Sequence, residues 1–203
     1  MPEMHTLALF IPTFFLVSIT PGMCMLLALS LGISVGLRRT LPMMLGELVG
    51  VTAVALAAAF GVAALLLTHP ALFTGLKALG GAYLIYLGLS SWRSSGGLVT
   101  TDDITDISRR SLALRGFTTA IANPKGWAFM VALLPPFLNQ QAPLLPQMAA
   151  LLAVIVVSEF ICMSLYASGG STLRRLLNRD NVKLMNRISG SIMVLLGVWL
   201  WLG

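Results

Sequence analysis

Four ionisable residues interrupt long apolar stretches of this chain, where a charge is costly and therefore informative. They are Glu47, Lys77, Lys125 and Glu159. A charge near the centre of a bilayer costs at least about 2.5–3.5 kcal/mol, so such residues are expected to face the protein interior or water and to be paired. A lysine and two glutamates can hold both ends of a zwitterion, the lysine its carboxylate and the glutamates its ammonium group. A buried carboxyl group can also carry a proton, because removal from water disfavours its charged form.

The depth of these residues is estimated from the helical rise of about 1.5 Å per residue across an apolar layer of about 30 Å. On this count Glu47, Lys125, Glu159 and the chain at Pro21 share one layer towards the cytoplasmic side. Lys77 falls near the outer face, where a long side chain can reach the headgroups, so we favour a structural role for it. An alternative for the shared layer is that Lys125 and Glu159 form only a buried structural ion pair.

Two prolines lie inside apolar runs and predict interrupted helices. Each lacks an N–H group and clashes with the carbonyl four residues earlier, so Pro21 and Pro124 should free the carbonyls of Val17 and Ala120. In a membrane such carbonyls need protein, water or a ligand as partners. The segment after each break begins like a helix N-terminus, which favours a carboxylate. The predicted substrate-binding residues are Pro21, Gly22, Glu47, Asn123, Pro124, Lys125 and Glu159, and the predicted proton-coupling residues are Glu159 and Glu47.

The composition indicates which elements must position these residues. Of the 203 residues, 57% are hydrophobic and only 10% are charged, against roughly 25% charged in a soluble domain. Apolar runs of about 20 residues predict an all-α integral membrane protein with one transmembrane domain, residues 1–203. The six predicted transmembrane helices are Leu7 to Ile33, Pro42 to Leu67, Ala71 to Trp92, Phe117 to Leu138, Gln147 to Ser168, and Ile188 to Gly203.

The basic residues predict the orientation of these helices, because short cytoplasmic loops are enriched in lysine and arginine. They cluster after the first, third and fifth helices, which places both termini outside. The clusters are Arg38 and Arg39; Arg93, Arg109, Arg110 and Arg115; and Arg174, Arg175, Arg179, Lys183 and Arg187.

Sequence echoes predict two inverted three-helix repeats, about 7–92 and about 117–203, joined by a cytoplasmic loop at about 93–116. Three is an odd number, so the second repeat enters the membrane from the opposite side, as in many transporters with a central binding site. The echoes pair Thr20-Pro21-Gly22 with Asn123-Pro124-Lys125-Gly126, and Lys77, Gly80 and Gly88 with Arg187, Gly190 and Gly197.

These motifs together resemble the lysine exporter / homoserine-threonine exporter family (LysE/RhtB) of small bacterial membrane proteins. The resemblance runs through almost the whole chain. It rests on Thr20-Pro21-Gly22, Gly36-Leu37-Arg38, Gly46 with Gly50, Leu79-Gly80-Gly81-Ala82-Tyr83-Leu84, Asn123-Pro124-Lys125, Leu134-Pro135-Pro136-Phe137, and Gly190 with Gly197.

The resemblance implies a secondary active exporter of amino acids or related metabolites in the bacterial cytoplasmic (inner) membrane, driven by the proton gradient, and not an enzyme. It also implies that Glu159 matches an acidic position of helix five. Met23-Cys24 after Pro21-Gly22, Val51 in helix two, and Pro136 depart from the family pattern, and they leave the substrate open.

The main alternative from another class is a transmembrane thiol and disulfide relay through Cys24 and Cys162. A passive channel is a third. The cysteines and histidines lack metal-ligand spacing, and no cofactor is expected. The cations have no interleaved aromatic residues to stack bases, so nucleic acid is not an expected partner. The expected partners are a small amino-acid-like molecule, protons and the lipid bilayer, while association of two copies as a homodimer is left open.

Overall fold

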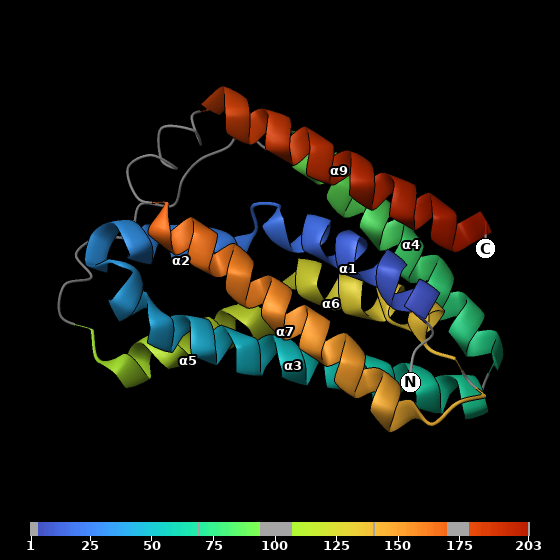
Figure 1. Cartoon of the computed structure of the whole chain (residues 1–203). Helices are drawn as coiled ribbons and strands as arrows, with labels where there is room; N and C mark the ends of the chain where they lie inside the picture. The colour runs from blue at the N-terminus through green and yellow to red at the C-terminus, as the bar shows by residue number, and fades with distance from the viewer. Residues whose placement is uncertain (1–3, 69, 94–106, 140, 170–178, 203) are drawn as a thin grey trace.

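The computed structural model describes residues 4–68, 70–93, 107–139, 141–169 and 179–202, and this part of the chain is helical throughout apart from short connections. The helices run side by side as an elongated bundle (Figure 1). They are α1 (Met4–Ile19), α2 (Met23–Val35), α3 (Leu37–Thr68), α4 (Pro70–Arg93), α5 (Arg109–Ile121), α6 (Pro124–Leu133), the short 3-10 helix η1 (Pro135–Phe137), α7 (Leu144–Ser168) and α9 (Arg179–Leu202).

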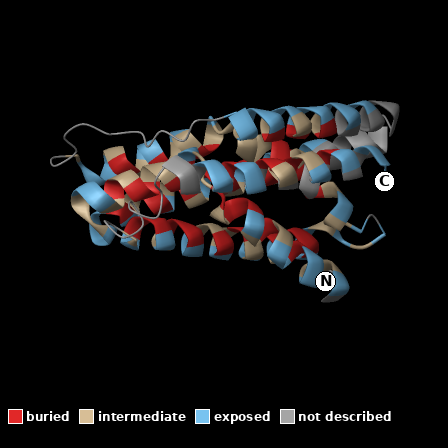
Figure 2. Ribbon diagram, turned by 90° about the horizontal axis from the view of Figure 1, so that it is seen from above, coloured by how far each residue is buried: buried red, intermediate tan, exposed pale blue. Residues whose placement is uncertain are grey.

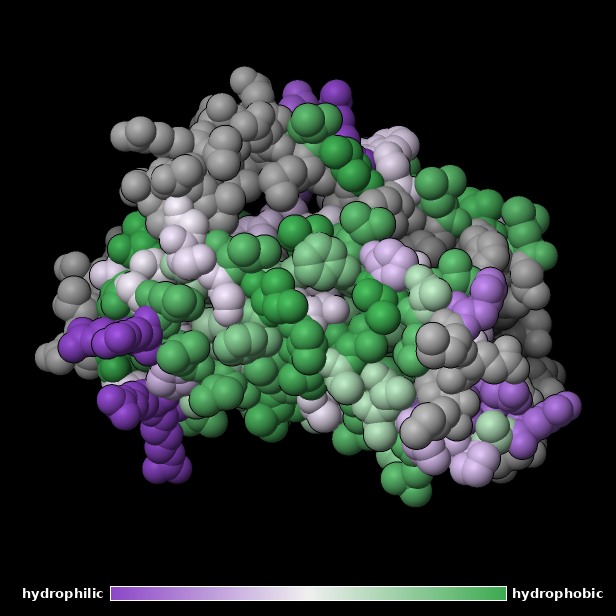
Figure 3. Space-filling view, viewed as in Figure 1, coloured by the Kyte–Doolittle hydropathy of each residue, from purple (hydrophilic) through white to green (hydrophobic). Residues whose placement is uncertain are grey.

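Long apolar helices make this a multi-pass membrane protein. Within the described residues, α3 and α7 are each long and apolar enough to cross a bilayer, and the bent pair α1 and α2 makes a third span if counted as one. Many large apolar side chains are exposed, including Leu45, Val49 and Leu79. Hydrophobic residues also cover the middle of the face seen in Figure 3, with the most hydrophilic residues at its margins. Such an apolar surface is favourable in contact with lipid tails and unfavourable in contact with water.

The predicted interruptions at Pro21 and Pro124 are confirmed. α1 ends at Ile19 and α2 begins at Met23 with a bend of 57° between them. α5 ends at Ile121 and α6 begins at Pro124. Proline alone does not explain the breaks, because Pro12 lies inside α1 and Pro42 inside α3 without ending either helix. At the first break Pro21 is followed by Gly22, whose backbone is unusually flexible. At the second break Pro124 is preceded by Asn123, which caps the next helix.

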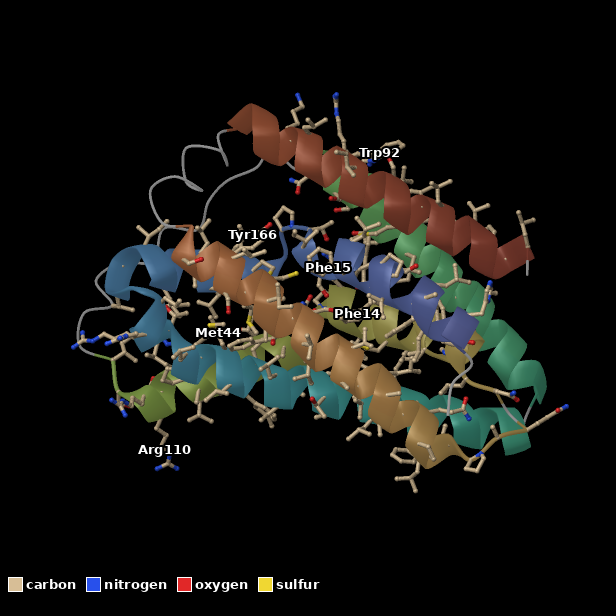
Figure 4. The ribbon with its side chains drawn as sticks, in the orientation of Figure 1. Phe14, Phe15, Met44, Trp92, Arg110 and Tyr166 are labelled. Carbon is tan, nitrogen blue, oxygen red and sulfur yellow. The ribbon has the colours of Figure 1, made fainter. Side chains whose placement is uncertain are left out.

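Several helices extend further than their apolar runs predict. α3 begins at Leu37, α5 at Arg109 and α9 at Arg179, so basic residues that were predicted to lie in loops occupy first turns of helices. Arg110, for example, points away from the bundle at the start of α5 (Figure 4). The bilayer limits the apolar length of a helix but not its hydrogen-bonded length, and arginine is a good helix former. The sixth segment, 16 residues by hydropathy, is therefore a helix of 24 residues.

Buried residues face the inside of the bundle and form three apolar clusters (Figure 2). The first joins α2, α3, α5 and α7, with Met44 and Met163 among its members. The second joins α1, α3, α6 and α7 and includes Phe10, whose ring lies 5.0 Å from that of Phe137. The third is smaller and links α1, α4, α6 and α9.

Glycines allow α3 and α5 to pack with their backbones in contact. A Cβ atom at Gly46 would overlap the carbonyl of Ala113, and one at Gly116 would overlap the carbonyl of Met43. Without a hydrophobic driving force between helices in lipid, such close approach supplies much of the attraction between them. This contact fixes the position of Glu47, which is the next residue after Gly46.

The pair α4 and α9 is held by a set of reciprocal contacts. The glycines of one helix face the glycines of the other, and each helix donates a tryptophan N–H to a backbone carbonyl of its partner. Figure 4 shows Trp92 of α4 lying beside α9. Ala78, Gly81, Gly88 and Trp92 of α4 correspond to Arg187, Gly190, Gly197 and Trp201 of α9, each 109 positions later in the chain. The contacts are Gly81 with Gly197, Gly88 with Gly190, Trp92 Nε1 with the Arg187 carbonyl (2.9 Å), and Trp201 Nε1 with the Ala78 carbonyl (2.8 Å).

Candidate functional site

A cavity lies inside the bundle where the three apolar clusters meet. Its volume is about 50 Å³, which at roughly 10–15 Å³ per water gives room for a few water molecules. Apolar members of each cluster form part of its wall, among them Met25, Phe14 and Phe129. The rest of the wall is polar and comes from α1, α2, α3, α6 and α7. The polar residues and glycines that line the cavity are Ser18, Thr20, Gly22, Cys24, Glu47, Asn123, Lys125, Gly126 and Glu159.

Lys125 connects the second break to the first. It lies in the first turn of α6, and its ammonium group donates hydrogen bonds to the carbonyls of Val17 (3.3 Å) and Thr20 (3.4 Å) and to the Thr20 hydroxyl group. Pro21 has no N–H to donate to the Val17 carbonyl, which instead accepts from the Thr20 N–H at 3.3 Å, from the Thr20 hydroxyl group at 2.6 Å and from Lys125. The ammonium group also lies 5.9 Å from the ring centre of Phe129. Lys125 therefore stabilises the open end of α1 across the cavity.

Two residues of α7 hold the same end of α1. Glu159 Oε1 accepts a hydrogen bond of 2.9 Å from the Ser18 hydroxyl group. The Tyr166 hydroxyl group donates to the Ile19 carbonyl at 2.8 Å, and Figure 4 places Tyr166 beside the gap between α1 and α2. In the described part of the chain, Lys125 and Glu159 are thus linked through α1 and do not form the direct ion pair that was the alternative reading of their spacing.

Glu47 differs from the other charged residues of the cavity. Its side chain is only 2% exposed, yet its Oε2 atom has no hydrogen-bond partner among the described residues. The Cys24 thiol lies beside the Glu47 carboxyl group and interacts with it. Asn123 Nδ2 in turn donates to Cys24 Sγ at 3.7 Å. A buried oxygen atom without a partner is unusual in a folded protein and calls for an explanation.

The second break is closed by local contacts. Asn123 is the N-cap of α6, and its Oδ1 accepts from the backbone N–H of Lys125 at 3.1 Å. Pro124 occupies the first position of α6, where its missing N–H leaves no bond unmade. Trp127 Nε1 donates to the Ile121 carbonyl at 2.8 Å. These bonds hold the N-terminus of α6, and with it Lys125, at the cavity wall.

The structure brings most of the predicted site residues to one cavity. Glu47, Lys125 and Glu159 line it from three helices, together with Gly22 and Asn123 at the two breaks. Pro21 and Pro124 shape the breaks but are not among the lining residues. The side chain of Lys77 lies outside the described residues.

Sequence reasoning missed the roles of Ser18, Thr20 and Tyr166. A signal existed for the first two, since hydroxyl groups just before a helix-breaking proline are well placed to serve the freed carbonyls. Nothing local marked Tyr166, because its partner is 147 positions away in the chain.

The site carries no metal-binding set, since the described residues contain no group of three or more His, Cys, Asp or Glu that could hold a metal ion. Cys24 and Cys162 are both free and buried. They give no support to the predicted alternative of a thiol relay.

Comparison with known proteins agrees with the resemblance seen in the motifs. The chain is 28% identical to a membrane protein of Vibrio cholerae over 98% of its own length and 97% of that protein. It is 28% identical to a homoserine/homoserine lactone efflux protein of Salmonella typhimurium, covering 91% of this chain and 90% of the relative. It is also 28% identical to a leucine efflux protein of an Enterobacter species, covering 89% and 87%. No solved structure matches the chain significantly.

The family model described as LysE type translocator matches residues 15–203, from the end of the first helix to the last residue. The match takes in both breaks and every residue that lines the cavity except Phe14. This chain belongs to the LysE type translocator family.

Proposed function

We propose that this protein exports small amino acids or closely related amino-group metabolites from the cytoplasm, and that the central cavity binds them. The observation that carries the proposal is the cavity itself, in which Glu47, Glu159 and Lys125 meet inside a membrane bundle. Intramembrane ionisable residues that face a shared cavity are typical of substrate and ion pathways. Homoserine and leucine, which the names of two relatives give as their substrates, are the first molecules to test.

The proposed architecture is two inverted three-helix repeats, α1 to α4 and α5 to α9, with α1–α2 and α5–α6 as the broken helices. The reciprocal contacts of α4 with α9 support this proposal, because an internal two-fold axis exchanges each contact with its partner. Alternating access in such proteins occurs when one repeat moves against the other around a fixed site. The termini are proposed to lie outside and the basic helix starts inside.

The proposed driving force is the proton gradient, with Glu159 and Glu47 as the groups that carry the proton. Both carboxyl groups line the cavity, and Glu159 lies near the Lys125 ammonium group. Removal of a carboxylate from water favours its neutral form, whereas a nearby cation or substrate amine favours the charged form. Substrate binding and proton release at such a site are therefore linked.

Transport into inverted membrane vesicles tests the proposal directly, because export from cells becomes uptake into these vesicles. Vesicles that contain the full chain should accumulate radiolabelled homoserine or leucine when respiration acidifies the lumen, and vesicles without it should not. An uncoupler should abolish the accumulation. Equilibration without accumulation indicates a channel, and absence of any amino-acid movement for a broad metabolite panel refutes the export proposal. Replacing both cysteines with serine should leave transport intact, whereas loss would favour a thiol relay.

A further inference from the structure

The polar groups of the cavity are not equally available to a substrate. Lys125 already donates to three acceptors at the end of α1, the carbonyls of Val17 and Thr20 and the Thr20 hydroxyl group. Asn123 uses its oxygen to cap α6 and its amide nitrogen to contact Cys24. Glu159 accepts from Ser18. Glu47 lines the cavity with a buried side chain, and its buried Oε2 atom lacks a hydrogen-bond partner among the described residues.

We infer that Glu47 is the recognition residue for the substrate's ammonium group, and that the site requires an amine but tolerates a substrate whose carboxylate is masked. This inference rests on the proposed function and deepens it by naming the substrate class, which is small primary amines with or without a free carboxylate. An ammonium group that donates to Oε2 would supply the partner that this buried oxygen lacks among the described residues.

The balance of ionisable groups in the cavity also favours recognition of an ammonium group. Two carboxyl groups, Glu47 and Glu159, face a single cation, Lys125. Lys125 can bind a substrate carboxylate only by giving up hydrogen bonds to Val17 or Thr20. The Val17 carbonyl would keep the bonds that it accepts from the Thr20 N–H and hydroxyl groups, so the cost falls mainly on the Thr20 carbonyl. A substrate carboxylate does not meet this obstacle at the N-terminus of α2, which has no side-chain cap. A helix end offers only partial charges, however, so it contributes less than a full opposite charge.

The N-terminus of α6 is less available to a substrate carboxylate than that of α2. Asn123 already occupies it by accepting from the Lys125 backbone N–H. The ammonium end of a substrate therefore meets a carboxyl oxygen without a partner among the described residues, and the carboxylate end meets groups that are already paired or only partly charged. A lactone, amide or ester of an amino acid keeps the first interaction and forgoes only the second.

A competition series on the unaltered protein tests the inference without any variant. Inverted vesicles take up radiolabelled leucine, or homoserine if leucine is not transported, in the presence of unlabelled analogues. Leucinamide and homoserine lactone keep the amine and lack the carboxylate, whereas 4-methylpentanoate keeps the carboxylate and lacks the amine. We expect the two amines to inhibit within about tenfold of the parent amino acid, and the acid to be weaker than the parent by roughly a hundredfold or more, as for a site whose buried polar group is left unpaired.

A pair of matched variants assigns the amine to one of the two carboxyl groups. Glu47→Gln and Glu159→Gln each replace a cavity carboxyl group by an amide of the same shape. Binding of leucine or leucinamide to the purified full chain is measured by its shift of the thermal unfolding temperature. This shift reports binding even when transport is lost, because a ligand stabilises the folded state that binds it. We expect Glu47→Gln to remove the shift, Glu47→Asp to retain part of it, and Glu159→Gln to reduce it less than Glu47→Gln does.

The outcomes separate this inference from the export proposal. If the acid inhibits uptake better than the amides do, the inference is overturned and amino-acid export still stands. The inference is likewise overturned if Glu159→Gln removes the ligand-induced shift while Glu47→Gln retains it. If no amino acid is transported or bound by the unaltered protein, the proposed function itself fails. A misfolded Glu47 variant leaves the competition series as the deciding measurement.

Discussion

The ammonium group of Lys125 donates a hydrogen bond to the carbonyl oxygen of Val17, 3.3 Å away and 108 positions earlier in the chain. Pro21 deprives that carbonyl of its helical partner, so the cation of one broken helix compensates for the break in the other. Tyr166 and Glu159 add contacts from α7 to the same turn. The first break is thus an ordered segment held by the side chains of Lys125, Tyr166 and Glu159, and the contribution of each can be tested by substitution.

Lys125→Met should abolish export and weaken the contact between α1 and α6. The substitution keeps the length of the side chain but removes the donors to Val17 and Thr20. We expect vesicle uptake to fall by at least about tenfold, the effect of roughly 1.4 kcal/mol on a transport step. Size-exclusion chromatography of the purified variant checks that it still assembles. Normal uptake by this variant would contradict a role for Lys125 at the site.

Glu159→Gln should uncouple or abolish export while the protein still folds. The amide can still contact the Ser18 hydroxyl group, but it cannot bind and release a proton in the same way as a carboxyl group. Uptake that no longer responds to an acid lumen, or no uptake at all, is the expected result. Accumulation at the normal rate and with normal sensitivity to an uncoupler would remove Glu159 from the proposed coupling mechanism.

Gly46→Ala should destabilise the packing of α3 against α5. Its added Cβ atom would overlap the Ala113 backbone carbonyl, which cannot move aside without shifting α5. Overpacking of this kind costs about 1–3 kcal/mol. Gly61→Ala is the matched control, because no atom of the described residues comes within 4 Å of a Cβ atom there. Thermal unfolding in detergent should show a lower transition temperature for Gly46→Ala only, and equal transitions would contradict the close contact.

Trp92→Phe and Trp201→Phe should destabilise the protein to a similar extent. Each removes one indole N–H bond to a carbonyl of the opposite helix, to Arg187 in the first case and Ala78 in the second. A hydrogen bond of this type contributes about 0.5–1.5 kcal/mol. Unfolding free energies of the two variants measure the effect. A large loss for one and none for the other would argue against an internal two-fold relationship between α4 and α9.

Reporter fusions should place both termini outside and the segment between α4 and α5 inside. The basic residues near Arg38, Arg110 and Lys183 set this orientation. Alkaline phosphatase, which is active only outside the cytoplasm, should therefore be active after residue 203 and inactive when inserted near residue 105. The opposite activities would overturn the proposed orientation.

The sequence alone was sufficient for the class of the protein and for the position of its two breaks. The apolar runs predicted transmembrane helices, because no soluble fold could bury so much apolar surface. Pro21 and Pro124 marked the interruptions through the loss of a backbone donor, which is a local property. The cost of charge in lipid likewise singled out Glu47, Lys125 and Glu159, and the structure places all three at one cavity.

The length of the helices was underestimated for a physical reason. Hydropathy reports how much of a helix lies in lipid, whereas the backbone hydrogen bonds of α5 and α9 continue into their basic first turns. The register between α4 and α9 was also beyond the sequence. The sequence similarity matched Gly80 with Gly190 as equivalent positions of the two repeats. The contacts of Gly81 with Gly197 and of Gly88 with Gly190 instead make Gly81 the equivalent of Gly190, since small shifts of helix rotation decide which side chains meet.

Only the tertiary structure decided which polar groups are satisfied and which are free. Periodicity places a residue on a face of its helix but does not reveal what lies opposite. The sequence predicted that Lys125 and Glu159 bind a ligand or pair with each other, whereas in the structure both are hydrogen-bonded to α1. Among the described residues, the Glu47 Oε2 atom has no partner. That distinction depends on how five helices converge within a few ångströms, which contacts between distant segments determine and local sequence does not.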